Sequence, residues 1–184
     1  MTRLTGEQPG RRRLHLISSP IMGRANPRFT TWHITFGTYG TRLHGGERPT
    51  VNVTHNQRGE PFIERDITLE QTKRHQMSAP PVHLTIEQQQ FIQQKVPSIC
   101  QRGGWQFRLC SAGDDHVHVL LDVDAAVHGE KVRRLLKRWL SQVLNEKWPR
   151  PAGGRWWAEQ GSNKAIRDPA HLENACAYIA RQRA

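Results

Sequence analysis

The sequence predicts an α+β fold of the ferredoxin-like, split βαβ type. We expect an antiparallel four-stranded sheet with two helices on one face and an extra C-terminal helix. One observation is the order of the local patterns, which runs strand, helix, strand, strand, helix, strand, with one further helix at the end. The other is size: 184 residues suit one domain better than two, and hydrophobic residues, at 36%, suffice for a core.

The chain begins with a basic arm, followed by the first strand and a long polar segment. Residues 1–28 are basic, rich in Gly, Pro and Ser and without periodicity, which predicts a flexible arm before a folded domain at 29–184. Residues 31–39 alternate and are rich in aromatic and β-branched types, which predicts a strand. Residues from about 40 to 83 are dominated by Gly, Pro, Asn and charge, which indicates a polar insertion with at most a short strand at 61–63.

A helix and a hairpin are predicted next. Thr85 with Gln88 three residues later forms a capping-box pattern, and Gly103 and Gly104 end the helix. Its apolar positions recur at helical spacing and are Leu84, Phe91, Ile92, Val96 and Ile99. Residues 105–112 and 116–123 read as two strands, and the turn at residues 113–115 between them predicts a hairpin.

The last three elements are a long helix, a strand and a final helix. Residues 129–147 have the clearest amphipathic pattern, with one apolar stripe and an opposite basic face. Residues 155–166 are predicted as the fourth strand. Asp168 followed by Pro169 is an N-cap with proline at the first helical position, so a helix should run from there to the C-terminus.

The charge of the chain favours a polyanionic partner. Lys and Arg outnumber Asp and Glu by 27 to 16, a net charge of +11, and nucleic acid is the commonest partner for such a protein. A solvated basic surface or attraction to anionic lipid fits the same charge. No apolar run approaches the roughly 18 residues of a transmembrane helix, so no membrane partner is expected. The three cysteines lack CxxC spacing and no signal peptide is evident, so we expect a cytoplasmic location.

Two histidines on the predicted third strand are the first candidate site residues. Side chains alternate on a strand, so His116 and His118 project from one face and Val117 from the other. Two imidazoles at this spacing can reach one divalent ion. Chance or two half-exposed strand residues account for the same pattern, so the pair by itself leaves metal binding open. The single His33 is expected to be an ordinary strand residue.

The final helix contributes a tyrosine and a glutamine. Its packing stripe consists of Leu172, Ala175, Cys176 and Ile179. Tyr178 and Gln182 are four residues apart and share a neighbouring face. A tyrosine hydroxyl can attack phosphorus, and an amide oxygen suits a hard cation. An ordinary helix tyrosine with a half-buried ring fits this pattern equally well.

Taken together, these segments resemble the single-tyrosine HUH transposases (histidine, hydrophobe, histidine), above all the REP-associated tyrosine transposases and their insertion-sequence relatives. The resemblance lies in residues 32–40, in Asp115 to Leu121, and in residues 165–168 and 177–180. It implies a metal-dependent single-stranded DNA endonuclease and strand transferase that cleaves next to a DNA hairpin through a 5′-phosphotyrosine. Tyr178 would be the nucleophile, and His116, His118 and Gln182 would hold Mg²⁺ or Mn²⁺.

The partner implied by the resemblance is single-stranded DNA with a hairpin, such as a REP-like element or an insertion-sequence end, bound by a monomer or a homodimer. Candidate DNA-binding residues share a positive charge and are Arg133, Arg134, Lys137, Arg138, Lys164 and Arg167. Trp156 and Trp157 are candidates for stacking on unpaired bases, with at least one expected in the core. Two alternatives stay open: a catalytically inactive nucleic-acid-binding module of the same fold, and a small metal-dependent hydrolase.

Overall fold

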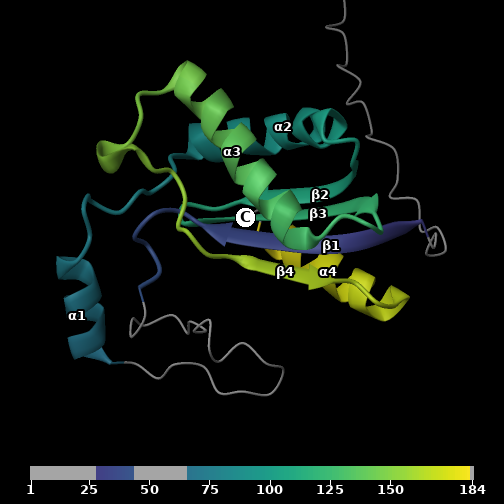
Figure 1. Ribbon diagram of the computed structural model, residues 1–184, viewed down its shortest axis with the longest axis horizontal. Helices are drawn as coiled ribbons and strands as arrows, with labels where there is room; N and C mark the ends of the chain where they lie inside the picture. Colours follow the sequence, from purple (N-terminus) through teal and green to yellow (C-terminus); the bar gives the residue numbers. More distant parts are fainter. Residues whose placement is uncertain (1–27, 44–65, 183–184) are drawn as a thin grey trace, which may run out of the picture.

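A four-stranded antiparallel sheet is the framework of the molecule (Figure 1). The computed structural model describes residues 28–43 and 66–182. The strands lie in the order β2-β3-β1-β4 and every neighbouring pair is antiparallel. They are β1 (Phe29–Gly37), β2 (Gln106–Ala112), β3 (His116–Asp124) and β4 (Ser162–Ala165).

Helices cover both faces of this sheet. The helices α2 (Ile86–Arg102) and α3 (Gly129–Lys147) pack on one face, and α4 (Pro169–Arg181) packs on the other (Figure 1). The predicted α+β arrangement, with two helices on one face and an extra C-terminal helix, is therefore confirmed.

The two faces of the central strands carry different side chains because successive residues of a strand point in opposite directions. Ile34 and Phe36 of β1 and Val117 and Val119 of β3 are buried in the main core under α2 and α3. On the other face Leu120 forms a small cluster with Ala175 and Ile179 of α4, against which Leu172 and Cys176 also pack. The packing stripe predicted for the final helix is thus confirmed. It lays that helix along the sheet face that carries His116 and His118, which we call the histidine face.

Local hydrogen bonds define the predicted ends of these elements. Gln88 donates its backbone N–H to Thr85 Oγ1 at 3.3 Å, while the Thr85 N–H donates to Gln88 Oε1 at 2.9 Å, so the capping box is present. The His171 N–H donates to Asp168 Oδ1 at 2.8 Å at the start of α4. The turn at Gly113, whose N–H donates to the His116 carbonyl at 2.9 Å, joins β2 to β3 as predicted.

The fourth strand is much shorter than the predicted 155–166. Trp157 forms only an isolated bridge with Thr38, and regular pairing resumes at Ser162. Between them Lys137 Nζ of α3 donates to the carbonyls of Ala158 at 2.5 Å and Glu159 at 2.8 Å. These carbonyls are hydrogen-bonded by a side chain in place of a neighbouring strand, which interrupts the ladder.

The polar insertion also differs from its prediction. Residues 44–65, with the short strand expected at 61–63, lie outside the described residues, as does the expected arm apart from Arg28. Beyond them α1 (Ile67–His75) is a helix, capped by Asp66, whose side chain accepts from the Leu69 N–H at 3.0 Å. None of the nine residues of α1 is buried, so it has no apolar stripe by which periodicity could have predicted it.

Among the helices described, none combines the length and the apolar character that crossing a bilayer would need.

Candidate active site

The two histidines of β3 lie side by side beneath α4. His116 and His118 are 9% and 4% exposed, and their ring centroids are 4.7 Å apart. Val117 between them points into the main core on the other face. The predicted alternation is therefore confirmed, and the polar face that it produces is buried.

Two residues of β1 lie within hydrogen-bond distance of Nδ1 of His118. His118 Nδ1 lies 3.1 Å from His33 Nε2 and 2.9 Å from Thr35 Oγ1, and Thr35 is its direct cross-strand partner. With its hydrogen on Nδ1, the His118 ring donates to both neighbours. Its Nε2 is then a buried lone pair that has no hydrogen-bond partner among the described residues.

A buried carboxylate orients His116 from the other side. Asp115 is 4% exposed, and its Oδ1 is hydrogen-bonded to His116 Nδ1. Its Oδ2 accepts from Arg42 Nε at 3.3 Å. Burial by itself would raise the pKa of Asp115, but the hydrogen bond with His116 and the charge of Arg42 outweigh it and lower that pKa. The carboxylate is therefore ionised and fixes the hydrogen of His116 on Nδ1.

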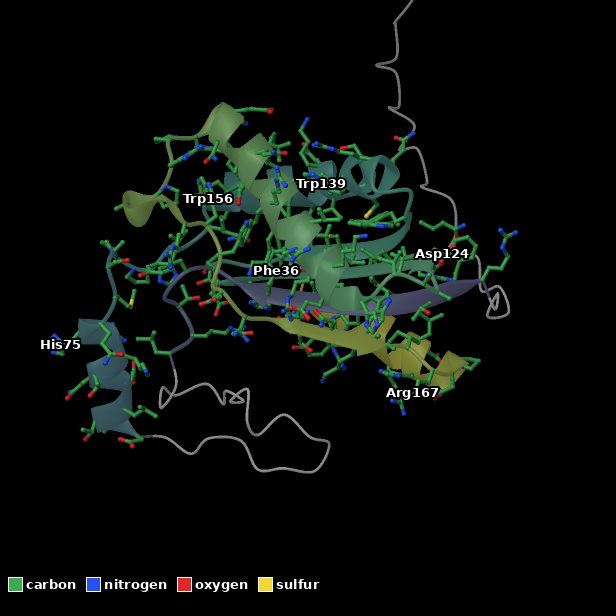
Figure 2. All side chains as sticks on the ribbon, in the orientation of Figure 1. Phe36, His75, Asp124, Trp139, Trp156 and Arg167 are labelled. Atoms are coloured by element: carbon green, nitrogen blue, oxygen red, sulfur yellow. The ribbon has the colours of Figure 1, made fainter. Side chains whose placement is uncertain are left out.

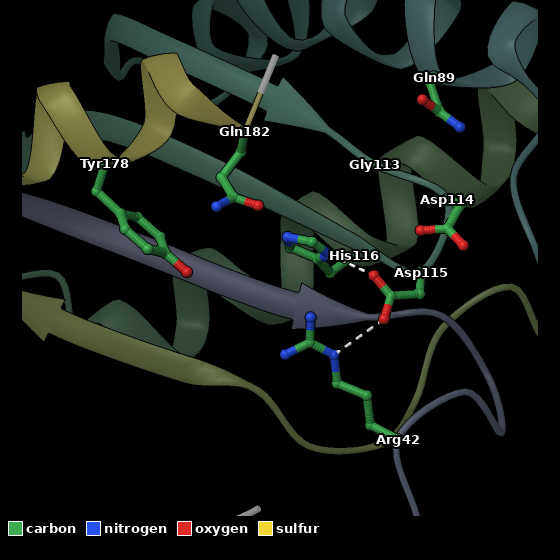
Figure 3. Close-up of a pocket in the computed structure, with 8 residues that line it drawn as sticks. All are labelled: Arg42, Gln89, Gly113, Asp114, Asp115, His116, Tyr178 and Gln182. Carbon is green, nitrogen blue, oxygen red and sulfur yellow. Dashed lines mark hydrogen bonds and ion pairs between the residues drawn. The ribbon is translucent and has the colours of Figure 1, made fainter. Parts of the chain in front are cut away.

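The helix α4 brings Tyr178 and Gln182 to the same place. The Tyr178 ring is edge-on to the His118 ring, with centroids 5.3 Å apart, and its centroid is 6.2 Å from that of His33. Tyr178 is 42% exposed although its helix neighbour Ile179 is fully buried. Figure 3 shows Tyr178, Gln182 and His116 directed into one pocket of about 450 Å³, with Arg42 and Asp115 on its opposite wall.

These donors fit a divalent metal ion. An imidazole that donates through Nδ1 presents Nε2 as a ligand, which is the usual arrangement at metal sites. His118 Nε2 is buried without a partner among the described residues, and the His116 ring is held in the same way by Asp115. Within residues 28–43 and 66–182, no three His, Cys, Asp or Glu side chains form a metal-binding group. Gln182, whose side chain carries an amide oxygen, lines the same pocket as His116.

Burial keeps the side chains of His33 and His118 neutral. Desolvation, followed by the neighbouring His116 and His33, lowers the pKa of His118 from 6.5 to about 3. Desolvation together with the charge of Lys164 lowers the pKa of His33 to about 4. Both rings therefore stay uncharged at neutral pH, the form in which an imidazole binds metal.

We expect the metal-free protein to lose stability as the pH falls below 6.5. Between 6.5 and about 4 the unfolded chain binds more protons at His33 and His118 than the folded chain does, so the free energy of unfolding decreases. Thermal unfolding followed by circular dichroism at about pH 7 and about pH 5 measures this. His33→Asn removes one of the two groups and should lessen the decrease. Equal midpoints for the wild type at both pH values would contradict the prediction.

The predicted DNA-binding residues fall on two sides of the sheet. Lys164 lies opposite His33 in the β1–β4 pair, on the histidine face, and Arg167 is exposed before α4 (Figure 2). The four basic residues of α3 belong to the helical layer on the other face. Two of them hold the loop before β4: Arg133 donates to the Gly161 carbonyl at 2.5 Å, and Lys137 donates to the two carbonyls described above. The structure thus brings Lys164 to the pocket side and leaves the α3 residues away from it.

Both tryptophans proposed for base stacking are core residues. Trp156 and Trp157 are 4% and 7% exposed and belong to the main core under α2 and α3. Figure 2 labels Trp156. Trp157 packs edge-on to Phe36 at 5.1 Å between ring centroids, and Trp156 Nε1 donates to Asn145 Oδ1 at 2.8 Å. Neither ring is available to an unpaired base, so the stacking prediction is wrong for both, whereas the expectation that at least one lies in the core is confirmed.

Sequence reasoning missed three residues of the site: His33, Asp115 and Arg42. A signal existed for His33, because His33 and Thr35 share one strand face in the same way as the histidine pair. Asp115 directly precedes His116, but its sequence pattern reads as a turn. Nothing local marks Arg42, since its contact with Asp115 spans 73 positions of the chain.

Comparison with known proteins identifies the family of the chain. Residues 80–182, more than half of the chain, match the family model described as transposase, IS200-like. Among solved structures, the chain is similar to a proposed transposase from Deinococcus radiodurans R1, with 16% identity, a TM-score of 0.50, and coverage of 88% of this chain and 97% of that one. At this identity the likeness concerns the fold alone. No curated protein matches the sequence.

Proposed function

The chain belongs to the IS200-like transposase family, and from this premise we propose that it is a metal-dependent single-stranded DNA endonuclease and strand transferase. It cleaves next to a DNA hairpin and becomes joined to the 5′ phosphate through Tyr178. We assign this activity to residues 29–184, with residues 1–28 as a basic arm.

One observation carries the proposal: Tyr178, His116 and Gln182 line one pocket of a single chain, and the ring of His118 lies against that of Tyr178. The centroids of these two rings are 5.3 Å apart. Tyr178 is 42% exposed, so a DNA strand can reach its side chain. Because one chain supplies all four residues, the arrangement supports cleavage by the tyrosine of the same subunit.

The chemistry is an exchange of one phosphodiester for another. The Tyr178 oxygen forms a bond to the scissile phosphorus as the bond from phosphorus to the 3′ oxygen breaks. The phenol proton passes to solvent, and the departing 3′ oxygen takes up a proton. The products are a 5′-phosphotyrosine and a free 3′ hydroxyl. Because the phosphotyrosine preserves the energy of the broken bond, a 3′ hydroxyl can attack it and rejoin the strand.

His116, His118 and Gln182 would hold the ion, Mg²⁺ or Mn²⁺. When bound, such an ion offsets the charge of the phosphate and orients it for in-line attack. Asp115, His33 and Thr35 contribute by fixing both imidazoles with their Nε2 atoms free for the ion. The neutral state of the His118 ring avoids repulsion between this ligand and the metal.

Basic residues on the histidine face would hold the strand. Two of the predicted DNA-binding residues are candidates: Lys164, which pairs with His33 across the β1–β4 ladder, and Arg167, which is exposed just before α4. Arg133, Arg134, Lys137 and Arg138 on α3 would contact only DNA that passes round an edge of the sheet, and Arg133 and Lys137 also hold the β4 loop.

The test is a search for the covalent intermediate. The protein is incubated with Mn²⁺ and a pool of single-stranded hairpin DNA carrying randomised flanks, then separated on a denaturing gel. The chain has two tyrosines, Tyr39 and Tyr178, so mass spectrometry of the adduct identifies the attached residue. We expect a nucleotide on Tyr178, and no adduct when EDTA is present.

Other outcomes would favour the alternatives. Cleavage that leaves no adduct would indicate a metal-dependent hydrolase in which Tyr178 is structural. Binding of the pool without cleavage of any member would indicate a nucleic-acid-binding module that lacks the reaction. An adduct on Tyr39 would contradict the assignment of the nucleophile.

A further inference from the structure

Arg42 is the cation of the pocket wall. The described residues that line the pocket include two carboxylates, Asp114 and Asp115, and a single positively charged side chain, Arg42. Arg42 lies beyond the end of β1 and before residues 80–182, which match the family model. Its side chain is 35% exposed, so solvent and a ligand both have access to it.

The contact with Asp115 leaves most of the guanidinium unused. An arginine that serves only to pair with a carboxylate commonly does so through two parallel N–H bonds. Here Nε alone donates to Asp115 Oδ2, at 3.3 Å, and no described residue accepts from either terminal nitrogen. In Figure 3 the terminal nitrogens point away from Asp115 into the space between His116 and Tyr178.

The other charged side chains of the pocket do not suit a phosphate. A phosphate that approaches Tyr178 meets two carboxyl side chains of the lining, Asp114 and Asp115. Among the described residues that line the pocket, Arg42 is the one Lys or Arg side chain that can bind it. A guanidinium is planar and always charged, and it recognises phosphate oxygens through paired donors.

We propose that Arg42 is a phosphate-binding residue, whose terminal nitrogens donate to a non-bridging oxygen of the DNA phosphate that faces Tyr178. This rests on the proposed function, since the phosphate is that of the strand to be cut. Asp115 then has two positioning roles: Oδ1 orients the metal-binding ring of His116, and Oδ2 orients Arg42. One buried carboxylate thereby positions both the metal-binding ring of His116 and the phosphate-binding group of Arg42.

The test measures DNA binding without chemistry. In EDTA, a fluorescent oligothymidylate of about ten nucleotides is titrated by anisotropy at several salt concentrations. Arg42→Gln should weaken binding about tenfold and reduce the slope of log K against log[salt] by about 0.7, the value for one phosphate contact on a single strand. Arg150→Gln is the matched control, because Arg150 is exposed beyond the end of α3 and is not among the residues that line the pocket.

A second readout locates the phosphate. With 3-fluorotyrosine in place of both tyrosines, ¹⁹F NMR gives one resonance for Tyr39 and one for Tyr178, assigned with Tyr39→Phe. The oligothymidylate should shift the Tyr178 resonance in the wild type and in Arg150→Gln, and much less in Arg42→Gln. Arg42→Lys keeps the charge and should restore the salt slope, even where Arg42→Gln alters thermal stability.

The outcomes separate the two proposals. If Arg42→Gln gives the same affinity, slope and Tyr178 shift as the wild type, the role of Arg42 is overturned while the proposed function stands. If the wild type binds neither the oligothymidylate nor any member of the hairpin pool, the proposed function fails and the role of Arg42 fails with it.

Discussion

Replacing Tyr178 with phenylalanine should abolish the covalent adduct and slow strand cleavage by on the order of 10³-fold or more, as loss of a nucleophile does in other covalent enzymes. The substitution removes one oxygen and keeps the ring that packs edge-on to His118 at 5.3 Å. Tyr178 makes no hydrogen bond to another described residue, so the fold loses none. The measurement is the rate of adduct formation on the DNA selected from the hairpin pool.

Tyr39→Phe is the matched control for this prediction. The Tyr39 hydroxyl lies 3.2 Å from Ser78 Oγ and accepts from the Ser78 N–H, so its loss affects the loop before α2 and not the pocket. We expect Tyr39→Phe to cleave at the wild-type rate. An adduct that persists in Tyr178→Phe would overturn the assignment of the nucleophile.

Replacing His118 with asparagine should weaken Mn²⁺ binding by at least about 100-fold, the upper end of the cost of losing an outer-shell partner. The asparagine amide nitrogen can take the place of Nδ1 and donate to Thr35, while the buried Nε2 is lost. The fold should therefore survive and the metal site should not. Isothermal titration with Mn²⁺ measures the affinity, and thermal unfolding in EDTA measures the fold.

His75→Asn makes the same change at an exposed position of α1 that is not among the residues lining the pocket, and it should leave Mn²⁺ affinity unchanged. A His118→Asn protein that binds Mn²⁺ as tightly as the wild type would contradict the metal site. If cleavage were lost with Mn²⁺ affinity intact, His118 would act on the DNA and not on the metal.

The regular elements could be predicted because their signals are local. The stripe of α3 and the capping box at Thr85 follow from spacings of three and four residues, and the bounds of α3 are those predicted. Where local signals were weak, the prediction was wrong. The helix α1 buries nothing and so has no apolar period, and the strand expected at 155–166 is interrupted because Lys137, distant in sequence, binds the loop carbonyls.

The sequence by itself determined that His116 and His118 share a face and that Tyr178 and Gln182 share another, since both follow from backbone periods of two and of nearly four residues. Only the tertiary structure decided that these two faces meet. The register of β1 with β3 brings His33 and Thr35 to His118, and the packing of Ile179 on Leu120 lays Tyr178 over the same ring. Arg42 joins Asp115 across 73 positions. Such contacts depend on how the sheet and α4 pack together, which no short stretch of sequence encodes.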